Sequence, residues 1–248
     1  MNSSANPTRD ALLDRLVVVL AKPAFSGNIG ATARVMANFG VRQGVLVAPR
    51  CDMNSLEARQ YATGISAVTL ATMSTVGSLR EALVGASSAV AVTRRTGKMR
   101  KPSMVISDLS QRLSQGRVCV VFGPEESGLT EEDLSHCSEV LTLDVSDQMP
   151  SMNLSHAVAV TLSQLFAHLS TGNNSISSLD SFPEVSELTS MTDRLREMLQ
   201  FLEAQSFCSN SEHLAHILTS NLRRARPNHA ELAAWQGFMS AILKLRSN

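Results

Sequence analysis

Five short runs of aliphatic and β-branched residues, separated by longer segments with helical spacing, constrain the fold of this chain more than any other feature. Their positions are residues 16–20, 44–48, 88–93, 117–122 and 140–143. The runs are largely apolar throughout, without the alternation that marks a strand with one solvated face. We therefore expect strands of a parallel sheet that is covered on both faces.

Helical patterns lie between these runs. We expect helices over residues 31–39, 78–85, 107–115 and 153–169. A further helix should begin after Thr130, which is followed by three acidic residues. A hydroxyl cap followed by acids in the first turn favours a helix N-terminus. The alternation of strands and helices predicts an α/β domain with a parallel sheet and helices on both faces.

Composition and hydrophobic pattern divide the chain into four segments. Residues 1–13 are expected to be a disordered lead-in, and residues 14–170 form the α/β domain. A Ser/Asn/Gly-rich linker covers 171–186, and 187–248 form a small helical C-terminal module with helical segments at 187–204, 211–222 and 229–245. The 248 residues suffice for one ordinary domain and such a module.

The bulk composition excludes several classes of protein. Hydrophobic residues make up 44% and charged residues 18%, which is typical of a globular chain. None of the four cysteines lies in a CxxC pair, so we expect a reduced, cytoplasmic protein without a disulfide framework or a metal site. No apolar stretch is long enough to span a membrane. The net charge is zero, so only the placement of charges can indicate a polyanionic partner.

The first candidate motif, SGNIGATAR at residues 26–34, follows a predicted strand. Its two glycines permit a tight turn and a close approach to a ligand, and a helix N-terminus suits phosphate. Arg34 lies about one turn further along the helix. For the glycine turn alone, an ordinary strand–helix turn is the favoured explanation. The G-x-G-x-x-G spacing of a dinucleotide site is absent.

Two further motifs also follow predicted strands. FGPEESGL at 122–129 could hold a ligand at the carboxyl end of its strand, or it could be a loop with two solvated glutamates. PSMNLSHA at 150–157 offers small hydrogen-bonding side chains at a helix start. Capping by Ser151 or Asn153 explains part of this third motif, and His156 is more often structural than catalytic in such a position.

Basic residues cluster twice. Five of the eight residues at 94–101 are basic, and three of the four at 223–226 are arginines. Such clusters contact phosphate backbones, although a solubilising surface loop is the alternative for the first.

Together and in this order, the three motifs resemble those of the SPOUT class of RNA methyltransferases. Within that class the chain is most similar to the TrmJ group, the tRNA (cytidine/uridine-32) 2′-O-methyltransferases, from about Leu16 to the end. The resemblance implies a trefoil knot in the C-terminal part of the α/β domain, S-adenosylmethionine as cofactor, tRNA or rRNA as substrate, and a homodimer. Met149 departs from the group, which often has tyrosine there.

The resemblance assigns roles at matching positions only. The implied catalytic residues are Asn28, Arg34, Ser151 and Asn153. The implied cofactor pocket consists of Val92, Thr93, Arg94, Gly123, Glu125, Gly128, Leu143, Pro150, Ser151, Met152 and Asn153. The implied RNA contacts are Arg34, Arg94, Arg95, Lys98, Arg100, Lys101, Arg223, Arg224 and Arg226.

Methyl transfer to a ribose hydroxyl sets the role that we expect for Arg34. A guanidinium keeps its proton, so Arg34 is expected to stabilise negative charge on the 2′-oxygen, while Ser151 or a water relays the proton. Three alternatives stay open. These are a related enzyme acting on another tRNA position or on rRNA, a non-catalytic RNA-binding paralogue, and an α/β enzyme that uses a nicotinamide cofactor.

Overall fold

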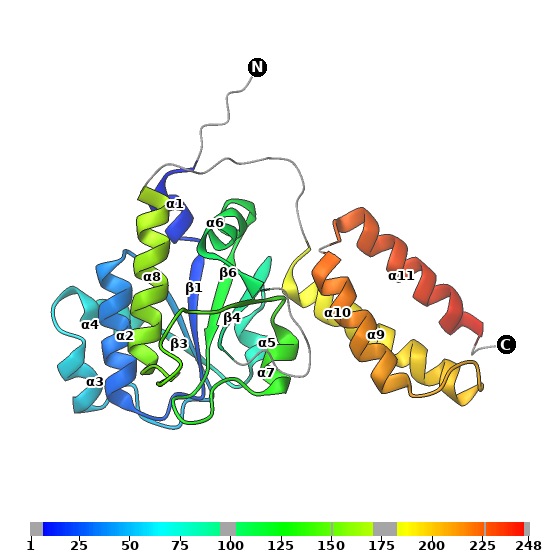
Figure 1. The fold of residues 1–248 in the computed structure, drawn as a ribbon, viewed down its shortest axis with the longest axis horizontal. Helices are drawn as coiled ribbons and strands as arrows, with labels where there is room; N and C mark the ends of the chain where they lie inside the picture. The colour runs from blue at the N-terminus through cyan, green and yellow to red at the C-terminus, as the bar shows by residue number, and fades with distance from the viewer. Residues whose placement is uncertain (1–6, 95–102, 150, 171–182, 226, 246–248) are drawn as a thin grey trace, which may run out of the picture. The chain divides into compact units, whose positions relative to one another are not determined.

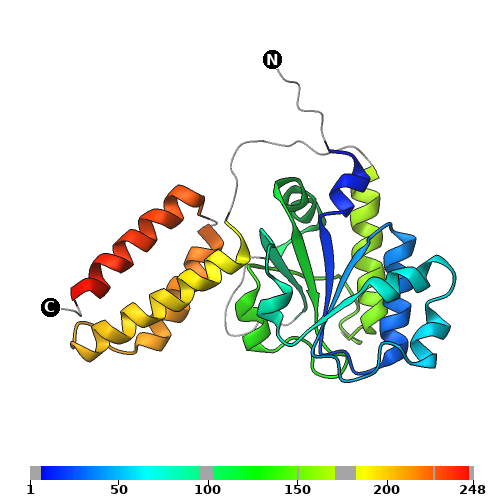
Figure 2. The ribbon, with the colours of Figure 1, turned by 180° about the vertical axis from the view of Figure 1, so that it is seen from behind.

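The computed structural model describes residues 7–94, 103–149, 151–170, 183–225 and 227–245, and the side chain of Arg223 is not described. The chain divides into two compact units, Met1–Ser178 and Leu179–Asn248. The division falls inside the segment expected to be a linker. Figures 1 and 2 show the α/β unit and the helical unit from opposite sides.

A parallel sheet of seven strands forms the centre of the first unit, as far as it is described. β1 (Leu16–Ala21) pairs with β2 (Gln43–Val47) on one side and with β6 (Val118–Phe122) on the other. The full strand order is β3-β2-β1-β6-β4-β7-β5, and the remaining strands are β3 (Ser74–Val76), β4 (Ser88–Val92), β5 (Ser103–Met104) and β7 (Glu139–Leu141). All five predicted strands are present, and β7 is shifted by one residue and ends two residues early.

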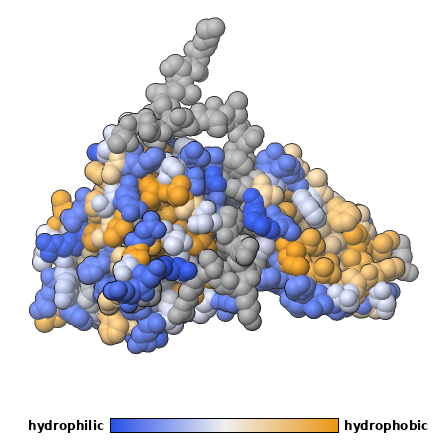
Figure 3. Space-filling view, in the orientation of Figure 1, coloured by the Kyte–Doolittle hydropathy of each residue, from blue (hydrophilic) through white to orange (hydrophobic). Residues whose placement is uncertain are grey.

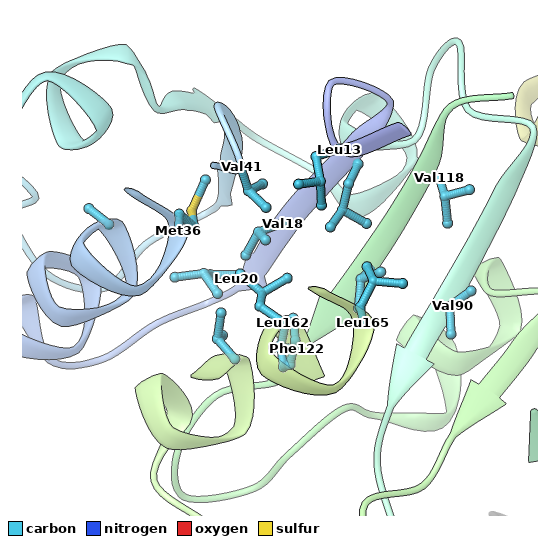
Figure 4. Packing of buried hydrophobic residues seen from close by; sticks show 14 of the residues in the cluster. Leu13, Val18, Leu20, Met36, Val41, Val90, Val118, Phe122, Leu162 and Leu165 are labelled. Atoms are coloured by element: carbon cyan, nitrogen blue, oxygen red, sulfur yellow. The ribbon is translucent and has the colours of Figure 1, made fainter. Parts of the chain in front are cut away.

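Helices cover both faces of the sheet, as the apolar strands predicted. On one face, side chains of β1 pack against α2 (Ser26–Asn38) and α8 (Leu154–Ser170). In Figure 4, Val18 and Leu20 of β1 lie beside Met36 of α2 and Leu162 of α8. On the other face, the Cys119 thiol contacts the carbonyl of Ala82 in α5. The remaining helices of this unit are α1 (Arg9–Leu13), α3 (Leu56–Tyr61), α4 (Ile65–Thr72), α5 (Leu79–Ala82), α6 (Ile106–Gln115) and α7 (Glu131–His136).

The N-terminal segment corrects one expectation. Residues 9–13 are helical rather than a disordered lead-in, while residues 1–6 lie outside the described part. Thr8 caps α1 by accepting a hydrogen bond from Ala11 N, and the apolar side chains of Leu12 and Leu13 are buried in the core. Arg9 places its guanidinium 4.2 Å from the ring centroid of Phe166 on α8. Hydrophobic burial therefore orders this segment despite its polar start.

Three helices form the second unit over its described residues. They are α9 (Val185–Ala204), α10 (Ser211–Ala225) and α11 (His229–Lys244), close to the predicted bounds. α10 and α11 both pack on α9 around a core that includes Met191, Leu195 and Met239. Figure 3 shows hydrophobic side chains on the surface of this unit. Trp235 and Phe238 of α11 are exposed and contact each other edge to face.

Candidate active site

A cavity of about 480 Å³ opens at the carboxyl ends of β4, β6 and β7. Its size falls within the usual range for small-molecule sites, and parallel α/β sheets bind ligands at this edge. The second and third motifs form much of its wall. The lining residues are Val92, Thr93, Arg94, Phe122, Gly123, Pro124, Glu125, Glu126, Ser127, Gly128, Leu143, Val145, Ser151, Met152, Leu154 and Ala157.

The residues expected to hold a cofactor therefore gather in one place. Nine of them line the cavity, namely Val92, Thr93, Arg94, Gly123, Glu125, Gly128, Leu143, Ser151 and Met152. Asn153 is not in the lining, and Pro150 lies outside the described residues. Sequence reasoning missed Phe122, Pro124, Glu126 and Ser127, although they lie inside the second motif. It also missed Leu154 and Ala157, which lie inside the third motif, and Val145, whose apolar side chain carried no distinct signal.

Gly123 and Gly128 shape the wall of the cavity. A Cβ atom at Gly123 would lie 2.3 Å from the backbone nitrogen of Leu129, a distance that real side chains do not reach. Gly128 has a φ of +65°, which favours glycine, and its N–H donates a 2.9 Å hydrogen bond to the Pro124 carbonyl. The loop thus folds back on itself beside the cavity, and only glycine at position 123 allows the backbones to approach so closely.

A hydrogen-bond network joins the three motifs. The Asn28 side-chain amide donates a 2.7 Å hydrogen bond to Glu125 Oε1, and Ala24 N–H donates a 3.0 Å bond to Glu125 Oε2. The Asn153 amide donates a 2.9 Å bond to Asn28 Oδ1. Asn153 Oδ1 in turn accepts hydrogen bonds from the backbone N–H and the hydroxyl of Ser155, so the Asn153 side chain caps the start of α8. Segments about 100 residues apart in the chain are thereby fixed to one another.

The glycines of the first motif have a different role from the one expected. They lie inside α2, which begins at Ser26 rather than near residue 31. A Cβ atom at Gly30 would lie 2.0 Å from the carbonyl oxygen of Ala58, and one at Gly27 would lie 2.8 Å from Glu57 Oε1. These glycines therefore admit close packing of α2 on α3, and they do not form a ligand-binding turn.

Arg34 lies on α2, outside the cavity lining, and its side chain is exposed. To the described residues it forms no hydrogen bond or ion pair. A guanidinium without such partners has its donors available for a group outside this chain. The structure thus brings Asn28 and Asn153 together, with Ser151 in the cavity wall, and places Arg34 outside the cavity lining.

The residues expected to contact RNA are only partly described. Arg94 lies at the mouth of the cavity and donates a 2.8 Å hydrogen bond to Asp147 Oδ1, an acid outside the basic cluster. Arg224 is exposed and bonds to the Asn221 side chain. The other expected positions lie outside the described residues or side chains, namely Arg95, Lys98, Arg100, Lys101, Arg223 and Arg226.

Within the described ranges, no group of three or more histidine, cysteine or acidic side chains could hold a metal ion. Among the helices described, none has both the length and the apolar character needed to cross a membrane. Cys51, Cys119, Cys137 and Cys208 are free cysteines. Burial raises the pKa of the Cys119 thiol to about 12 and also raises the pKa of Cys51.

Comparison with known proteins agrees with this geometry. Residues 15–163, which hold all three motifs, match the model of the SpoU rRNA methylase family. The tRNA (cytidine/uridine/adenosine-2′-O-)-methyltransferase TrmJ of Pseudomonas aeruginosa is 34% identical over 154 residues, which are 60% of this chain and 59% of that protein. The tRNA (cytidine/uridine-2′-O-)-methyltransferase TrmJ of Pectobacterium atrosepticum is 27% identical over 94% of this chain and 98% of its own length.

A solved structure extends the similarity to the helical unit. The crystal structure of TrmJ from Z. mobilis ZM4 aligns with a TM-score of 0.76 and 25% identity, and it covers 91% of this chain and 98% of that one. The fold, the order of the motifs and the family match agree with one another. On this evidence the chain belongs to the SpoU rRNA methylase family.

Proposed function

We propose that this protein is an S-adenosylmethionine-dependent methyltransferase that methylates the ribose 2′-hydroxyl of tRNA, with the nucleotide at position 32 of the anticodon loop as its target. One observation carries the proposal. The cavity formed by the second and third motifs is joined to the first motif through the Glu125–Asn28–Asn153 hydrogen bonds. The names of the TrmJ relatives, which act on cytidine and uridine 2′-oxygens, support the reaction and the substrate class.

The residues of the cavity fit S-adenosylmethionine. The volume of about 480 Å³ suits a nucleoside with an amino-acid side arm. Val92, Leu143 and Met152 offer apolar surface for the adenine, and the glycines at 123 and 128 let the loop fold back on itself beside the cavity. S-adenosylmethionine, when bound, supplies an electrophilic methyl group on a sulfonium sulfur.

The chain's own residues must then hold the ribose oxygen in line with that methyl group. Transfer of this methyl group would require the ribose 2′-hydroxyl to lose its proton, so the site must also provide a path for that proton. Alignment of the two reactants supplies a large part of the rate. Asn28 and Asn153, fixed by Glu125, orient the ribose, and the Ser151 hydroxyl or a water relays the proton. Arg34 stabilises the negative charge that develops on the oxygen and contacts the neighbouring phosphate.

We further propose a homodimer, because Arg34 is outside the cavity lining of its own chain. A second copy can supply this side chain to the pocket, which completes the site.

We also propose that the C-terminal part of the α/β unit forms a trefoil knot, as in the SPOUT class that the motifs resemble. The basic residues at 94–101 and 223–226 bind the tRNA backbone. The free cysteines are in keeping with a reduced, cytoplasmic setting.

The test is transfer of a labelled methyl group from S-adenosylmethionine to RNA. Unmodified tRNA transcripts and rRNA fragments are incubated separately with the wild-type protein and with Arg34→Ala. We expect label in the tRNA with the wild type and a strong loss with the variant. Label in rRNA alone would move the substrate assignment to rRNA. Cofactor binding by calorimetry without transfer to either RNA would identify a non-catalytic paralogue.

A further inference from the structure

Aromatic rings are scarce in this chain, and two of them are exposed beside the first motif. The sequence has eight phenylalanines, one tryptophan and one tyrosine. Among the described residues of the α/β unit, the exposed phenylalanine and tyrosine rings are those of Phe25, at 52%, and Tyr61, at 51%. Phe25 is the N-cap residue of α2, and the Tyr61 ring lies so close to Gly27 that a Cβ there would be 3.1 Å from Tyr61 Cε2. Phe25 therefore directly precedes the first turn of α2, and the Tyr61 ring lies beside that turn.

The backbone of Phe25 is tied directly to the active-site network. Its neighbour Ala24 donates its N–H to Glu125 Oε2 at 3.0 Å, and the Phe25 carbonyl accepts a 3.1 Å bond from Asn28 N–H. The next residue, Ser26, donates its hydroxyl to the Asp52 carbonyl at 2.8 Å. A half-exposed ring on such a fixed backbone can receive a flat ligand without losing much conformational freedom on binding.

A positive charge accompanies the ring. Arg50 is exposed, its N–H donates to the Pro23 carbonyl at 2.9 Å, and its guanidinium Nε donates to the Lys22 carbonyl at 3.3 Å. To the described residues, the other guanidinium N–H groups of Arg50 make no hydrogen bond. An exposed aromatic side chain and an arginine anchored on the same loop match the base and the phosphate of an unstacked nucleotide.

We propose that Phe25, with Tyr61 at its side, stacks on an unpaired RNA base at the active site, while Arg50 contacts the phosphate of the same strand. The proposal rests on the proposed function and adds the surface that recognises a splayed-out nucleotide. In this proposal Glu125 lies between two binding surfaces, one for the methyl donor and one for the base. The cavity for the methyl donor lies at β4, β6 and β7, and the base-binding surface lies at the loop after β1, where Glu125 joins them.

Three substitutions of Phe25 test the role of the ring. Phe25→Ala and Phe25→Leu remove it, and Phe25→Trp keeps an aromatic face. Val84→Ala is the matched control, because Val84 is an exposed apolar residue after α5, before the amino end of β4. The measurements are KM for tRNA, the dissociation constant for a single-stranded RNA oligonucleotide, the affinity for S-adenosylmethionine by calorimetry, and molar mass by light scattering.

We expect Phe25→Ala and Phe25→Leu to raise KM for tRNA and the oligonucleotide dissociation constant about tenfold, with unchanged cofactor affinity and molar mass. Phe25→Trp should stay within about twofold of wild type, and Arg50→Ala should reduce the salt dependence of binding. Equal RNA affinity in Phe25→Leu and wild type would overturn the stacking role. So would a lower molar mass in Phe25→Leu, since the ring would then belong to an interface between copies.

The outcome can be separated from that of the proposed function. A wild-type protein that transfers no methyl group to RNA contradicts the proposed function, and the oligonucleotide affinities of the Phe25 variants still test the ring. A wild-type protein that methylates tRNA, with Phe25 variants that bind and react normally, contradicts only the stacking proposal.

Discussion

The amide of Asn28 donates a 2.7 Å hydrogen bond to Glu125 Oε1, across 97 positions of sequence. Because Glu125 Oε2 accepts the Ala24 N–H as well, one carboxylate holds both the start of α2 and the side chain of Asn28. Asn153 extends the contact to the start of α8. Both carboxylate oxygens of Glu125 are thus directed at the protein, and we expect Glu125 to act as a positioning residue.

Glu125→Gln should separate positioning from cofactor binding. A carboxamide has a single acceptor oxygen, so either Asn28 or the Ala24 N–H loses its partner. We expect kcat to fall about tenfold or more and the free energy of unfolding to fall by about 1–2 kcal/mol, with a smaller change in cofactor affinity. Steady-state kinetics and urea unfolding measure this. Glu132→Gln, at an exposed acid in α7, is the matched control, and similar losses in both variants would contradict the assignment.

Gly123→Ala should damage the cavity. The added Cβ would lie 2.3 Å from Leu129 N and 2.5 Å from the Gly128 carbonyl carbon, so backbone must move beside the ligand. We expect cofactor affinity to fall about tenfold or more in calorimetry, together with a lower Tm.

The control for this variant is Gly237→Ala, in the exposed part of α11, where an added Cβ meets nothing within 4 Å. Alanine there should raise stability by up to about 1 kcal/mol, because it is the better helix former. Cofactor affinity in Gly123→Ala equal to that of wild type would show that the loop does not border the ligand.

Substitution of Arg34 tests the electrostatic role. Arg34→Ala should lower kcat about 100-fold, the effect of losing one donor to a developing oxyanion. Arg34→Lys keeps the charge but loses the planar fork, so we expect an intermediate rate. Arg42→Ala removes another exposed arginine, paired with Asp14, and should leave the rate unchanged. A rate for Arg34→Ala within a few-fold of wild type would exclude the role.

Much of this fold follows from sequence patterns. The central strands were predictable because both faces of β1 and β6 are buried, which requires apolar residues at every position. β3 and β5 were not, because they are three and two residues long and form the edges of the sheet. The strand order also lay beyond the sequence, since parallel connections allow many orders.

The sequence predicted many residues of the site but not the hydrogen bonds between them. The three motifs are local in sequence, so their residues could be recognised, but the hydrogen bonds from Glu125 to Asn28 and from Asn153 to Asn28 depend on how distant segments meet. The glycines at 27 and 30 suggested a ligand turn, yet their partner is α3, a helix that the sequence pattern did not indicate. Contacts between distant segments require the tertiary structure.

The start of α7 offers a stability test. Thr130 Oγ1 accepts the Asp133 N–H at 3.1 Å, and the Asp133 carboxylate accepts the Thr130 N–H at 3.0 Å. Thr130→Ala should lower the free energy of unfolding by about 1 kcal/mol, and Thr130→Ser should retain most of it. Urea unfolding measures both, and an equal loss in the two variants would rule out the cap.

The buried Cys119 thiol predicts a dependence of stability on pH. Burial raises its pKa from 9.0 to about 12, so above about pH 9 the unfolded chain loses a proton that the folded chain keeps. Stability from this group is complete below pH 9 and declines as pH rises from there. The decline should be smaller in Cys119→Ala than in wild type when thermal unfolding is followed between pH 8 and 10. Parallel curves would contradict the raised pKa.

Mass spectrometry of nucleosides from tRNA incubated with the protein and methyl-labelled S-adenosylmethionine tests ribose methylation directly. We expect labelled 2′-O-methylcytidine or 2′-O-methyluridine, and digestion into fragments should place it at position 32. Arg34→Ala should give little of either product. A label on a base, or no labelled nucleoside in tRNA that the protein demonstrably binds, would contradict ribose methylation.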